Sequence, residues 1–363
     1  MKIAFRVDAS LSIGTGHVMR CMTLARAWRD RGADCLFICR EHPGNMLAFL
    51  REEGFRAHSL LWKDGKHFEY ELAHGEWLGT SQEIDGAESL QPIAKFHPDW
   101  LIVDHYALDA KWERIVRPHV RELLVIDDLA DRHHVCSLLL DQTLGRRAQT
   151  YEPFVSSDCK ILAGATYALL RPEFASLRSA TLARRLSGEL NYILITMGGV
   201  DRPNATGAIL DVLRSFPLPA RCEITVVMGA KAPWLEDVRQ QARTMTVPTR
   251  VLTDIRDMAA LMANSDIAIG AAGSTSWERC CLGLPTILLV LADNQRFGAT
   301  QLAQAGAAYM VGEIRDIANR LPGALSDLIA KDARTHMAAQ ASKICDGMGV
   351  SRVMRMMEPS YDG

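Results

Sequence analysis

The chain has 363 residues, of which 48% are hydrophobic and 23% charged, and its formal net charge is −2. This balance is ordinary for a globular protein and gives no overall electrostatic attraction to nucleic acid or to an anionic membrane surface. The length favours two domains over one. The nine cysteines form no CxxC pair and show no metal-ligand spacing. We therefore expect buried, reduced thiols in a cytoplasmic protein without a leader or a membrane-spanning helix.

The first half alternates short apolar runs with amphipathic stretches. Residues 2–7 predict a first strand, and residues 17–31 predict a helix because their apolar side chains recur at helical spacing. Further strands are expected at 35–39, 100–103, 123–126, 138–140 and 161–170. Apolar strands without polar alternation indicate a sheet covered on both faces, and the helices between them indicate parallel order. This half predicts a doubly wound α/β domain.

A second series of the same kind follows. Strands are expected at 192–196, 223–228, 250–252, 267–269, 286–291 and 308–311, and helices at 205–216, 259–264, 297–305 and 326–341. The predicted organisation is an N-terminal domain at 1–172, a linker at 173–189, a C-terminal domain at 190–345 and a helix or tail at 346–363. Ligands of open α/β sheets bind outside the carboxyl ends of the strands. We therefore expect two Rossmann-like domains facing across a cleft.

The stretch Gly-Thr-Gly-His-Val-Met-Arg at 14–20 follows the first predicted strand. A glycine-rich turn that opens a helix directs backbone N–H groups at whatever lies above it, which favours an anion. His17 stands at the helix start, where the helix dipole favours the neutral imidazole, so it is a candidate general base. Arg20 lies one turn further on. The alternative is a purely steric turn at Gly14 and Gly16 with a surface histidine.

Polar residues also end two later strands of the first half. Asp104, His105 and Tyr106 follow one strand, and Asp127 and Asp128 follow the next. Such positions face the same edge of the sheet as the first turn. The Tyr106 hydroxyl can hydrogen-bond a substrate, and His105 or Asp104 can orient neighbouring groups. The alternative is that these side chains satisfy loop backbone groups or cap helices.

In the second half, two glycine-containing loops follow predicted strands. Gly199 ends the pair of glycines at 198–199, which allows a ligand to approach the backbone closely. Gly273, Ser274 and Thr275 lie in a run of small residues at 270–276, whose N–H and hydroxyl groups suit a diphosphate. Glu278, one turn later, is placed to accept ribose hydroxyls. Its alternative role is favourable interaction with the helix dipole.

A polar loop follows the strand at 286–291. Asn294 and Gln295 in this loop can donate and accept hydrogen bonds to sugar hydroxyl and acetamido groups. Their alternative role is an Asx-type turn before the next helix. The sequence shows no Walker lysine motif, no HExxH and no nucleophile elbow.

Together these motifs resemble the GT-B superfamily of UDP-sugar enzymes. The stretch 252–285 is similar to the nucleotide-binding half of the peptidoglycan UDP-GlcNAc transferase family. The openings at 5–10 and 13–20, with 102–106, 197–201 and 293–295, resemble more closely the UDP-sugar hydrolase family of pseudaminic acid biosynthesis. This resemblance spans nearly the whole chain, and it is weakest after residue 343.

The resemblance implies hydrolysis of UDP-2,4-diacetamido-2,4,6-trideoxy-β-L-altropyranose to UDP and the free sugar, without a metal or other cofactor. It implies that His17 is the base that activates water. It further implies that the substrate side of the site consists of Gly14, Gly16, Arg20, Tyr106, Asn294 and Gln295, and the UDP side of Gly199, Ile255, Gly273, Ser274, Thr275 and Glu278. Ile255 would offer backbone groups to uracil.

Two rival functions remain open on the sequence alone. One is a GT-B glycosyltransferase using a UDP-sugar donor, in which His17 would deprotonate an acceptor hydroxyl. The rather acidic segment 69–88 argues mildly against a membrane-acting transferase. The other is a binding protein that holds a nucleotide sugar without turnover. A hydrolase of a related UDP-diacetamido sugar is the nearest variant. We expect a monomer that binds a small UDP-sugar and water and that binds neither nucleic acid nor a membrane.

Overall fold

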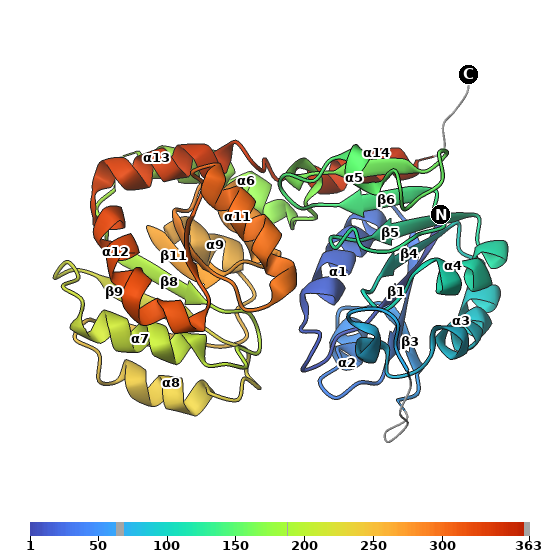
Figure 1. Ribbon diagram of the computed structural model, residues 1–363, viewed down its shortest axis with the longest axis horizontal. Helices are drawn as coiled ribbons and strands as arrows, with labels where there is room; N and C mark the ends of the chain where they lie inside the picture. The colour runs from blue at the N-terminus through green and yellow to red at the C-terminus, as the bar shows by residue number, and fades with distance from the viewer. Residues whose placement is uncertain (63–68, 187, 359–363) are drawn as a thin grey trace. The chain divides into compact units, whose positions relative to one another are not determined.

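The computed structural model describes residues 1–62, 69–186 and 188–358. The chain forms two compact units, residues 1–169 with 349–363 and residues 170–348 (Figure 1). Each unit contains one sheet whose paired strands are all parallel, with helices between the strands. The predicted α/β class with two doubly wound Rossmann-like domains is confirmed.

The first sheet has the strand order β3-β2-β1-β4-β5-β6-β7. Its strands are β1 (Lys2–Val7), β2 (Asp34–Arg40), β3 (Arg56–Leu60), β4 (Trp100–Asp104), β5 (Glu122–Ile126), β6 (Leu138–Asp141) and β7 (Lys160–Ala163). The order reverses between β1 and β4, which pair in register from Ile3 with Trp100 to Val7 with Asp104. The carboxyl ends of these two strands are called here the first switch point. Crevices form at such reversals because the connections leave in opposite directions.

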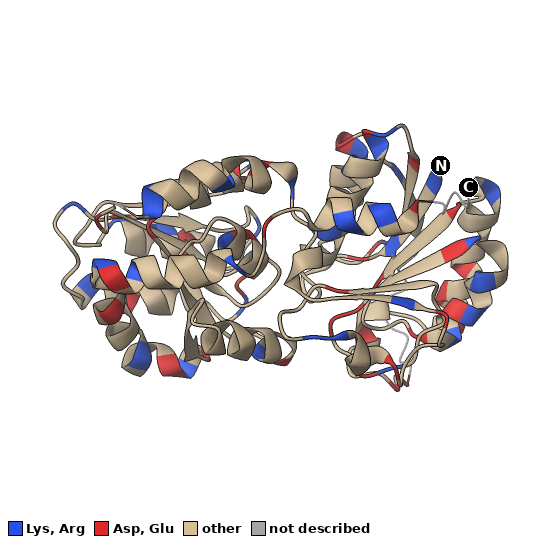
Figure 2. Cartoon of the chain, turned by 90° about the horizontal axis from the view of Figure 1, so that it is seen from above, with Lys and Arg blue, Asp and Glu red and all other residues tan. Residues whose placement is uncertain are grey.

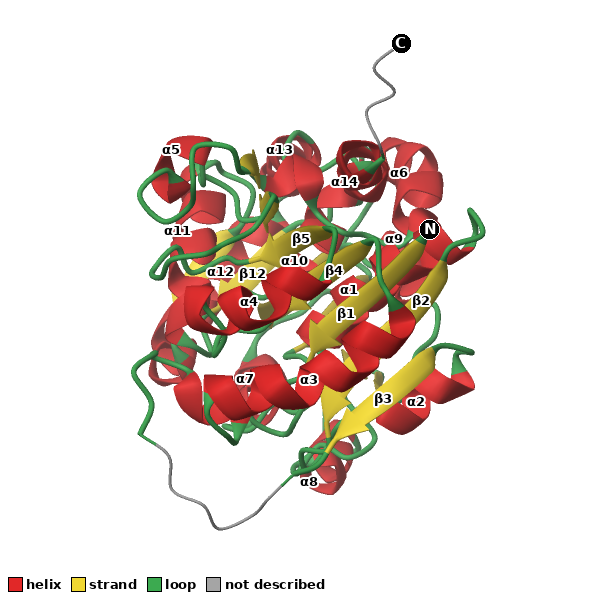
Figure 3. Ribbon diagram, turned by 90° about the vertical axis from the view of Figure 1, so that its right-hand side faces the viewer, coloured by secondary structure: helices red, strands yellow, loops and turns green. Residues whose placement is uncertain are grey.

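Helices cover both faces of this sheet because successive strand residues point to opposite sides. Ile3, Phe5 and Val7 pack in one core cluster with α1 (Gly16–Arg29), whereas Ala4 packs in another. The second face is covered by α3 (Gln82–Phe96) and α4 (Ala110–Val116), which lie on the far side of the strands from α1 (Figures 1 and 3). The remaining helices of the unit are α2 (Leu47–Glu52), α5 (Ala148–Tyr151) and α14 (Gly349–Met357).

The second sheet has the order β10-β9-β8-β11-β12-β13. Its strands are β8 (Tyr192–Thr196), β9 (Glu223–Val227), β10 (Thr249–Leu252), β11 (Ile267–Ala271), β12 (Thr286–Leu289) and β13 (Tyr309–Gly312). The reversal here falls between β8 and β11, whose carboxyl ends form the second switch point. Its helices are α6 (Pro172–Arg185), α7 (Ala205–Ser215), α8 (Leu235–Ala242), α9 (Met258–Asn264), α10 (Thr275–Cys281), α11 (Arg296–Gln304), α12 (Ile317–Ile329) and α13 (Lys331–Ser342).

The structure corrects three local expectations. The segment 173–189, expected as a linker, forms α6 for most of its length and belongs to the second unit, where Arg185 donates hydrogen bonds to three backbone carbonyls. The strand expected at 161–170 ends at Ala163, because Gly164 turns the chain with φ +111°. The helix expected at 326–341 is two helices, separated by extended backbone at Ala330.

The final helix returns to the first unit. The domain boundary expected at 345 lies close to the end of the second unit at residue 348. Beyond it, α14 packs its apolar side on the first core through Val353, Met354 and Met357. The indole of Trp100 donates to the carbonyl of Met357 at 3.0 Å, which fixes this helix beside β4.

Along the ribbon of each unit in Figure 2, positions of Lys and Arg are interspersed with positions of Asp and Glu. None of the helices in residues 1–62, 69–186 and 188–358 is long and apolar enough to cross a bilayer. All nine cysteines are free thiols, eight of them buried.

Candidate active site

A histidine and a carboxylate meet at the first switch point. His17 lies in the first turn of α1, which follows β1, and Asp104 is the last residue of β4. The His17 Nδ1 atom is 2.6 Å from Asp104 Oδ1. Burial alone would raise the pKa of Asp104, but the charges of Arg20 and His17 outweigh burial and hold it well below its ordinary value. Asp104 is therefore an ionised carboxylate.

This contact determines which nitrogen of His17 is free. An ionised carboxylate only accepts hydrogen bonds, so Nδ1 must carry the proton that it shares with Asp104. The lone pair of the neutral ring is then on Nε2, the arrangement in which a carboxylate orients a histidine base. The side chain is 11% exposed. His17 is thus built as a proton acceptor at Nε2.

Arg20 holds the carboxylates of this site in place. Its Nε and Nη2 atoms donate to the two oxygens of Asp104 at 2.6 and 2.7 Å, and Nη1 donates to Asp128 at 2.9 Å. Because the guanidinium is occupied on both sides by carboxylates, the structure places Arg20 as a support for Asp104. Its expected contact with substrate stays a prediction.

Tyr106 lies beside the base with its hydroxyl already engaged. Its ring is edge-on to the ring of His17 with centroids 4.7 Å apart, and its hydroxyl donates to Asp128. The residue is 5% exposed. The contact expected between this hydroxyl and a sugar therefore competes with a protein carboxylate, and Asp128 joins the site through both Arg20 and Tyr106.

Two further ring-bearing residues, His74 and Trp77, lie beside Tyr106, and the sequence patterns did not single them out. The rings of Trp77 and Tyr106 stack with centroids 5.5 Å apart, and the ring centroids of His74 and Trp77 are 4.5 Å apart. Burial is the largest effect on His74 and lowers its pKa, which favours the neutral ring. Both residues lie at a short 3-10 turn (Gly75–Leu78), where no periodic pattern marks them.

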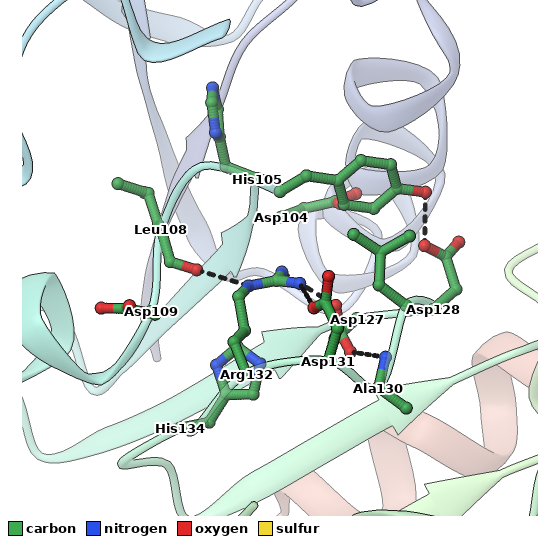
Figure 4. A network of polar contacts seen from close by, with 12 residues as sticks. Asp104, His105, Leu108, Asp109, Asp127, Asp128, Ala130, Asp131, Arg132 and His134 are labelled. Atoms are coloured by element: carbon green, nitrogen blue, oxygen red, sulfur yellow. Dashed lines mark hydrogen bonds and ion pairs between the residues drawn. The ribbon is translucent and has the colours of Figure 1, made fainter. Parts of the chain in front are cut away.

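A polar network fixes the loops that carry Tyr106 and Asp128 (Figure 4). Asp127 pairs with Arg132 at 2.8 Å and accepts from the backbone N–H of Ala130 at 2.9 Å. Arg132 also donates to the carbonyl of Leu108 at 2.9 Å. The alternative role expected for Asp127 was a helix cap, whereas here it binds a loop N–H group and Arg132.

His105 belongs to a different network behind the site. Its Nδ1 accepts from the backbone N–H of Ala107 at 3.1 Å, and its Nε2 is 3.2 Å from Asp8. Asp8 is fully buried and pairs with Arg6 at 2.7 Å, and Arg6 pairs in turn with Asp85 at 2.6 Å. These ion pairs join the carboxyl ends of β1 and β4 to α3.

The glycines of the opening motif form a turn. Gly14 has φ +78°, which side chains other than glycine rarely adopt, and its N–H donates to the carbonyl of Ser10 at 2.8 Å. The Ser10 hydroxyl accepts from the backbone N–H groups of Ser12 and Ile13. Gly16 begins α1. The turn delivers His17 to the switch point, whereas a direct ligand contact of either glycine stays a prediction.

In the second unit, the loop 270–276 leads from β11 into α10. Ser274 is the N-cap of α10, and its side chain makes no capping hydrogen bond. The first N–H groups of a helix have no acceptor within the helix. Ser274 is exposed, and Gly273 and Thr275 are half-buried. The loop thus presents hydroxyl and N–H donors at the second switch point.

Arg171 contacts Glu278 and the backbone next to Ile255. Both Glu278 and Ile255 were expected to bind the nucleoside. The Nη2 atom of Arg171 is 3.9 Å from Glu278 Oε1, and its Nη1 donates to the carbonyl of Arg256, next to Ile255, at 3.1 Å. Burial raises the pKa of Glu278 to about 7, against the opposing charges of Arg171 and Arg279. The structure therefore brings Glu278 and the segment of Ile255 to one arginine, which sequence patterns did not single out.

The other predicted contacts lie on neighbouring loops of the second unit. Gln295 accepts from the N–H of Leu291 at 3.0 Å, and its Nε2 would be 3.9 Å from a Cβ at Gly273. Asn294 is half-buried on the same loop, in a short 3-10 turn. Gly199 is exposed after β8. Their roles stay predictions.

Among the described residues, no group of three or more His, Cys, Asp or Glu is arranged to hold a metal ion. The two switch points offer a histidine with its carboxylate on the first unit and hydrogen-bond donors on the second unit. This set suits proton transfer and binding of an anionic ligand.

Most of the second unit resembles a known glycosyltransferase domain. Residues 193–350 match the glycosyltransferase family 28 C-terminal domain. Over 156 residues the chain is 30% identical to the UDP-N-acetylglucosamine--N-acetylmuramyl-(pentapeptide) pyrophosphoryl-undecaprenol N-acetylglucosamine transferase of Caulobacter vibrioides, covering 42% of this chain and 43% of that one. The similarity expected to the peptidoglycan transferase is confirmed.

Two relatives align over most of their length. The UDP-2,4-diacetamido-2,4,6-trideoxy-beta-L-altropyranose hydrolase of Campylobacter jejuni is 27% identical, covering 84% of this chain and 97% of that protein. The spore coat polysaccharide biosynthesis protein SpsG of Bacillus subtilis is 25% identical, covering 100% and 99%. An uncharacterised protein of Methanocaldococcus jannaschii is 23% identical, covering 82% of this chain but only 57% of its own length.

The solved structure of MurG from Acinetobacter baumannii has the same fold. It superposes with a TM-score of 0.70 at 16% identity, covering 98% of this chain and 99% of that one. The fold is thus that of GT-B glycosyltransferases. The chain is a glycosyltransferase-like protein with relatives among enzymes of UDP-sugars, hydrolase and transferases alike.

Proposed function

We propose that this protein hydrolyses a UDP-linked diacetamido sugar, UDP-2,4-diacetamido-2,4,6-trideoxy-β-L-altropyranose, to UDP and the free sugar. The observation that carries the proposal is the contact of His17 Nδ1 with Asp104 at 2.6 Å, which leaves Nε2 as a base. The similarity to the Campylobacter jejuni hydrolase over 97% of that protein supports the choice of reaction.

The proposed reaction is a displacement at the anomeric carbon. His17 Nε2 accepts a proton from water as the water oxygen bonds to that carbon, and the bond between the carbon and the diphosphate oxygen breaks. The electron pair of that bond leaves with UDP. Asp104 stabilises the resulting imidazolium through the Nδ1 proton. A positioned general base contributes about 10² to 10⁴ in rate.

The second unit would bind the leaving group. The N–H and hydroxyl donors of the 270–276 loop suit the diphosphate, and such donors stabilise negative charge as it develops. Glu278, ionised above pH 7, would accept the ribose hydroxyls, and the backbone at Ile255 would meet uracil. The loop with Asn294 and Gln295 would contact the acetamido groups of the sugar.

An assay without an acceptor tests the proposal. Purified protein, the diacetamido sugar nucleotide and EDTA should release UDP and free sugar in equal amounts, followed by chromatography or NMR. The conservative variant His17→Asn should keep UDP binding and lose turnover. Unchanged turnover in His17→Asn would remove the assigned base.

A second candidate is a GT-B transferase that uses a UDP-sugar donor. The match of residues 193–350 to a glycosyltransferase domain favours it. In that case UDP release would depend strictly on an added acceptor, and His17 would take the proton of an acceptor hydroxyl. UDP release in buffer alone excludes this reading, and binding without any UDP release would indicate a nucleotide-sugar binding protein.

A further inference from the structure

The second switch point contains a buried arginine that the proposed reaction does not use. Arg279, on α10, is 1% exposed. A Cβ built on Gly270 would lie 2.2 Å from its Nη1 atom and 3.2 Å from the carbonyl oxygen of Thr196. Thr196 ends β8, and Gly270 lies near the end of β11. The guanidinium therefore occupies the space between these two strand ends that glycine leaves open.

This guanidinium is incompletely paired. Its Nη2 donates to the carbonyl of Ala271 at 2.7 Å and to the hydroxyl of Ser276 at 3.0 Å. Its Nε and Nη1 atoms have no hydrogen-bond partner within residues 1–62, 69–186 and 188–358, and no carboxylate in that part of the chain forms an ion pair with it. Burial lowers the pKa of Arg279 to about 10, which still leaves it charged at neutral pH.

Other buried arginines of the chain are compensated. Arg185 in the same unit donates from Nε, Nη1 and Nη2 to the carbonyls of Leu282, Ser265 and Met262. Arg6 and Arg20 in the first unit are each paired with two carboxylates. Arg279 differs from Arg6 and Arg20 because both acceptors it contacts are neutral. It differs from Arg185 because two of its donor atoms, Nε and Nη1, are unsatisfied.

A buried cation without a direct ion-pair partner destabilises the folded protein, because its desolvation is repaid only in part by the more distant charge of Glu278. An anion bound at the loop above it would repay part of this free energy, and the low dielectric of the interior would strengthen the attraction. Arg279 also holds that loop directly, since Ala271 and Ser276 flank Gly273, Ser274 and Thr275.

We propose that Arg279 supplies the positive charge that selects a diphosphate at the 270–276 loop, acting from beneath the loop without contact to the ligand. The inference rests on the proposed nucleotide site of the second unit. It predicts that Arg279 distinguishes UDP from uridine and contributes little to binding of the nucleoside itself.

Calorimetric titration of the full chain with UDP and with uridine tests this. Arg279→Gln removes the charge and keeps an amide donor on a shorter side chain. The ratio of UDP to uridine affinity should fall about tenfold in this variant, the size of one charge-assisted interaction. Arg279→Lys, which keeps the charge, should retain most of the ratio. Arg185→Gln is the matched control and should leave the ratio unchanged.

The outcomes separate the two proposals. Equal losses for UDP and uridine in Arg279→Gln, or a ratio unchanged from the wild type, would overturn the role of Arg279 while the nucleotide site stands. A wild-type chain that binds neither ligand would overturn the nucleotide site and this inference with it. If Arg279→Gln does not fold, Arg279→Met titrated in the same way carries the same expectation.

Discussion

The two units share a sheet topology but use their switch points in opposite ways. At the first, between β1 and β4, the cation Arg20 is paired with Asp104 and Asp128, and the net effect is to hold a histidine in one tautomer. At the second, between β8 and β11, the cation Arg279 has no carboxylate partner among the described residues. Under the proposed function, the same architecture would serve proton transfer in one unit and attraction of an anion in the other.

The largest effect expected is at the base of the first unit. His17→Asn should lower turnover by about 10² to 10⁴, because it removes the Nε2 atom that is assigned to accept the proton of water. Affinity for UDP should stay within about twofold, since UDP is assigned to the second unit. Steady-state kinetics with calorimetry measure both. A parallel loss of UDP affinity would break the division of labour between the two units.

Asp104→Asn tests whether the carboxylate fixes the tautomer. The amide can present an N–H to His17, which would place the lone pair of the ring on Nδ1, so turnover should fall by about 10² or more. Because the folded state lowers the pKa of Asp104, its stabilising contribution is present above the unfolded value near 4 and is lost as pH falls below it. The variant should therefore lose stability at pH 7 relative to the wild type, and less so at pH 3. Thermal unfolding at the two pH values measures this.

Glu278→Gln tests the role of the second unit in binding the nucleoside. The raised pKa of about 7 predicts that uridine affinity in the wild type increases from pH 6 to pH 8, as the carboxylate ionises, and that the variant loses this dependence. Uridine is the suitable ligand because it carries no phosphate that titrates in this range. Pronounced pH dependence that persists in Glu278→Gln would assign the titration to another group.

The same variant should be more stable than the wild type at high pH. A carboxyl group whose folded pKa lies above its unfolded value costs stability, and the cost grows from about pH 4.5 to pH 7 and is constant above. The gain on substitution should be about 1–3 kcal/mol at pH 8 and close to zero at pH 4. Denaturant unfolding at both pH values checks the sign.

The last prediction concerns the contact of Gly270 with Arg279. Gly270→Ala should destabilise the wild type by about 1–3 kcal/mol, because its Cβ would meet the guanidinium at 2.2 Å. In an Arg279→Met background the cost should be smaller, since a flexible side chain can move aside. A double-mutant cycle on unfolding free energies measures the coupling. Additive effects would mean that the two residues do not contact each other.

Much of the fold follows from the sequence because buried parallel strands are short apolar runs without polar alternation. The exceptions have local causes. The strand β3 was not expected, since Arg56–Leu60 contains arginine, histidine and serine at an edge of the sheet. The helix α3 was not expected either. It begins within the acidic segment 69–88, and its Asp85 is fully buried against Arg6.

The position of a site residue was predictable where it follows a strand. Contacts between residues that are distant in sequence were not predictable. His17, Asp104 and the 270–276 loop all lie at carboxyl ends of strands, so the sheet topology places them. The pairing of His17 with Asp104 joins residues 87 positions apart. Arg171 and Arg279 were missed because an isolated arginine on a helix or a connector carries no pattern that distinguishes a buried cation from a surface one.

The return of α14 to the first unit has a consequence for chain entropy. Residues 170–348, which contain every strand and helix of the second unit, separate α14 in sequence from the rest of the first unit. The partner of Trp100 and part of the first core therefore come from a distant segment of the chain. Because the entropy cost of closing a loop grows with its length, α14 docks at a larger cost than a helix continuous with the first unit would.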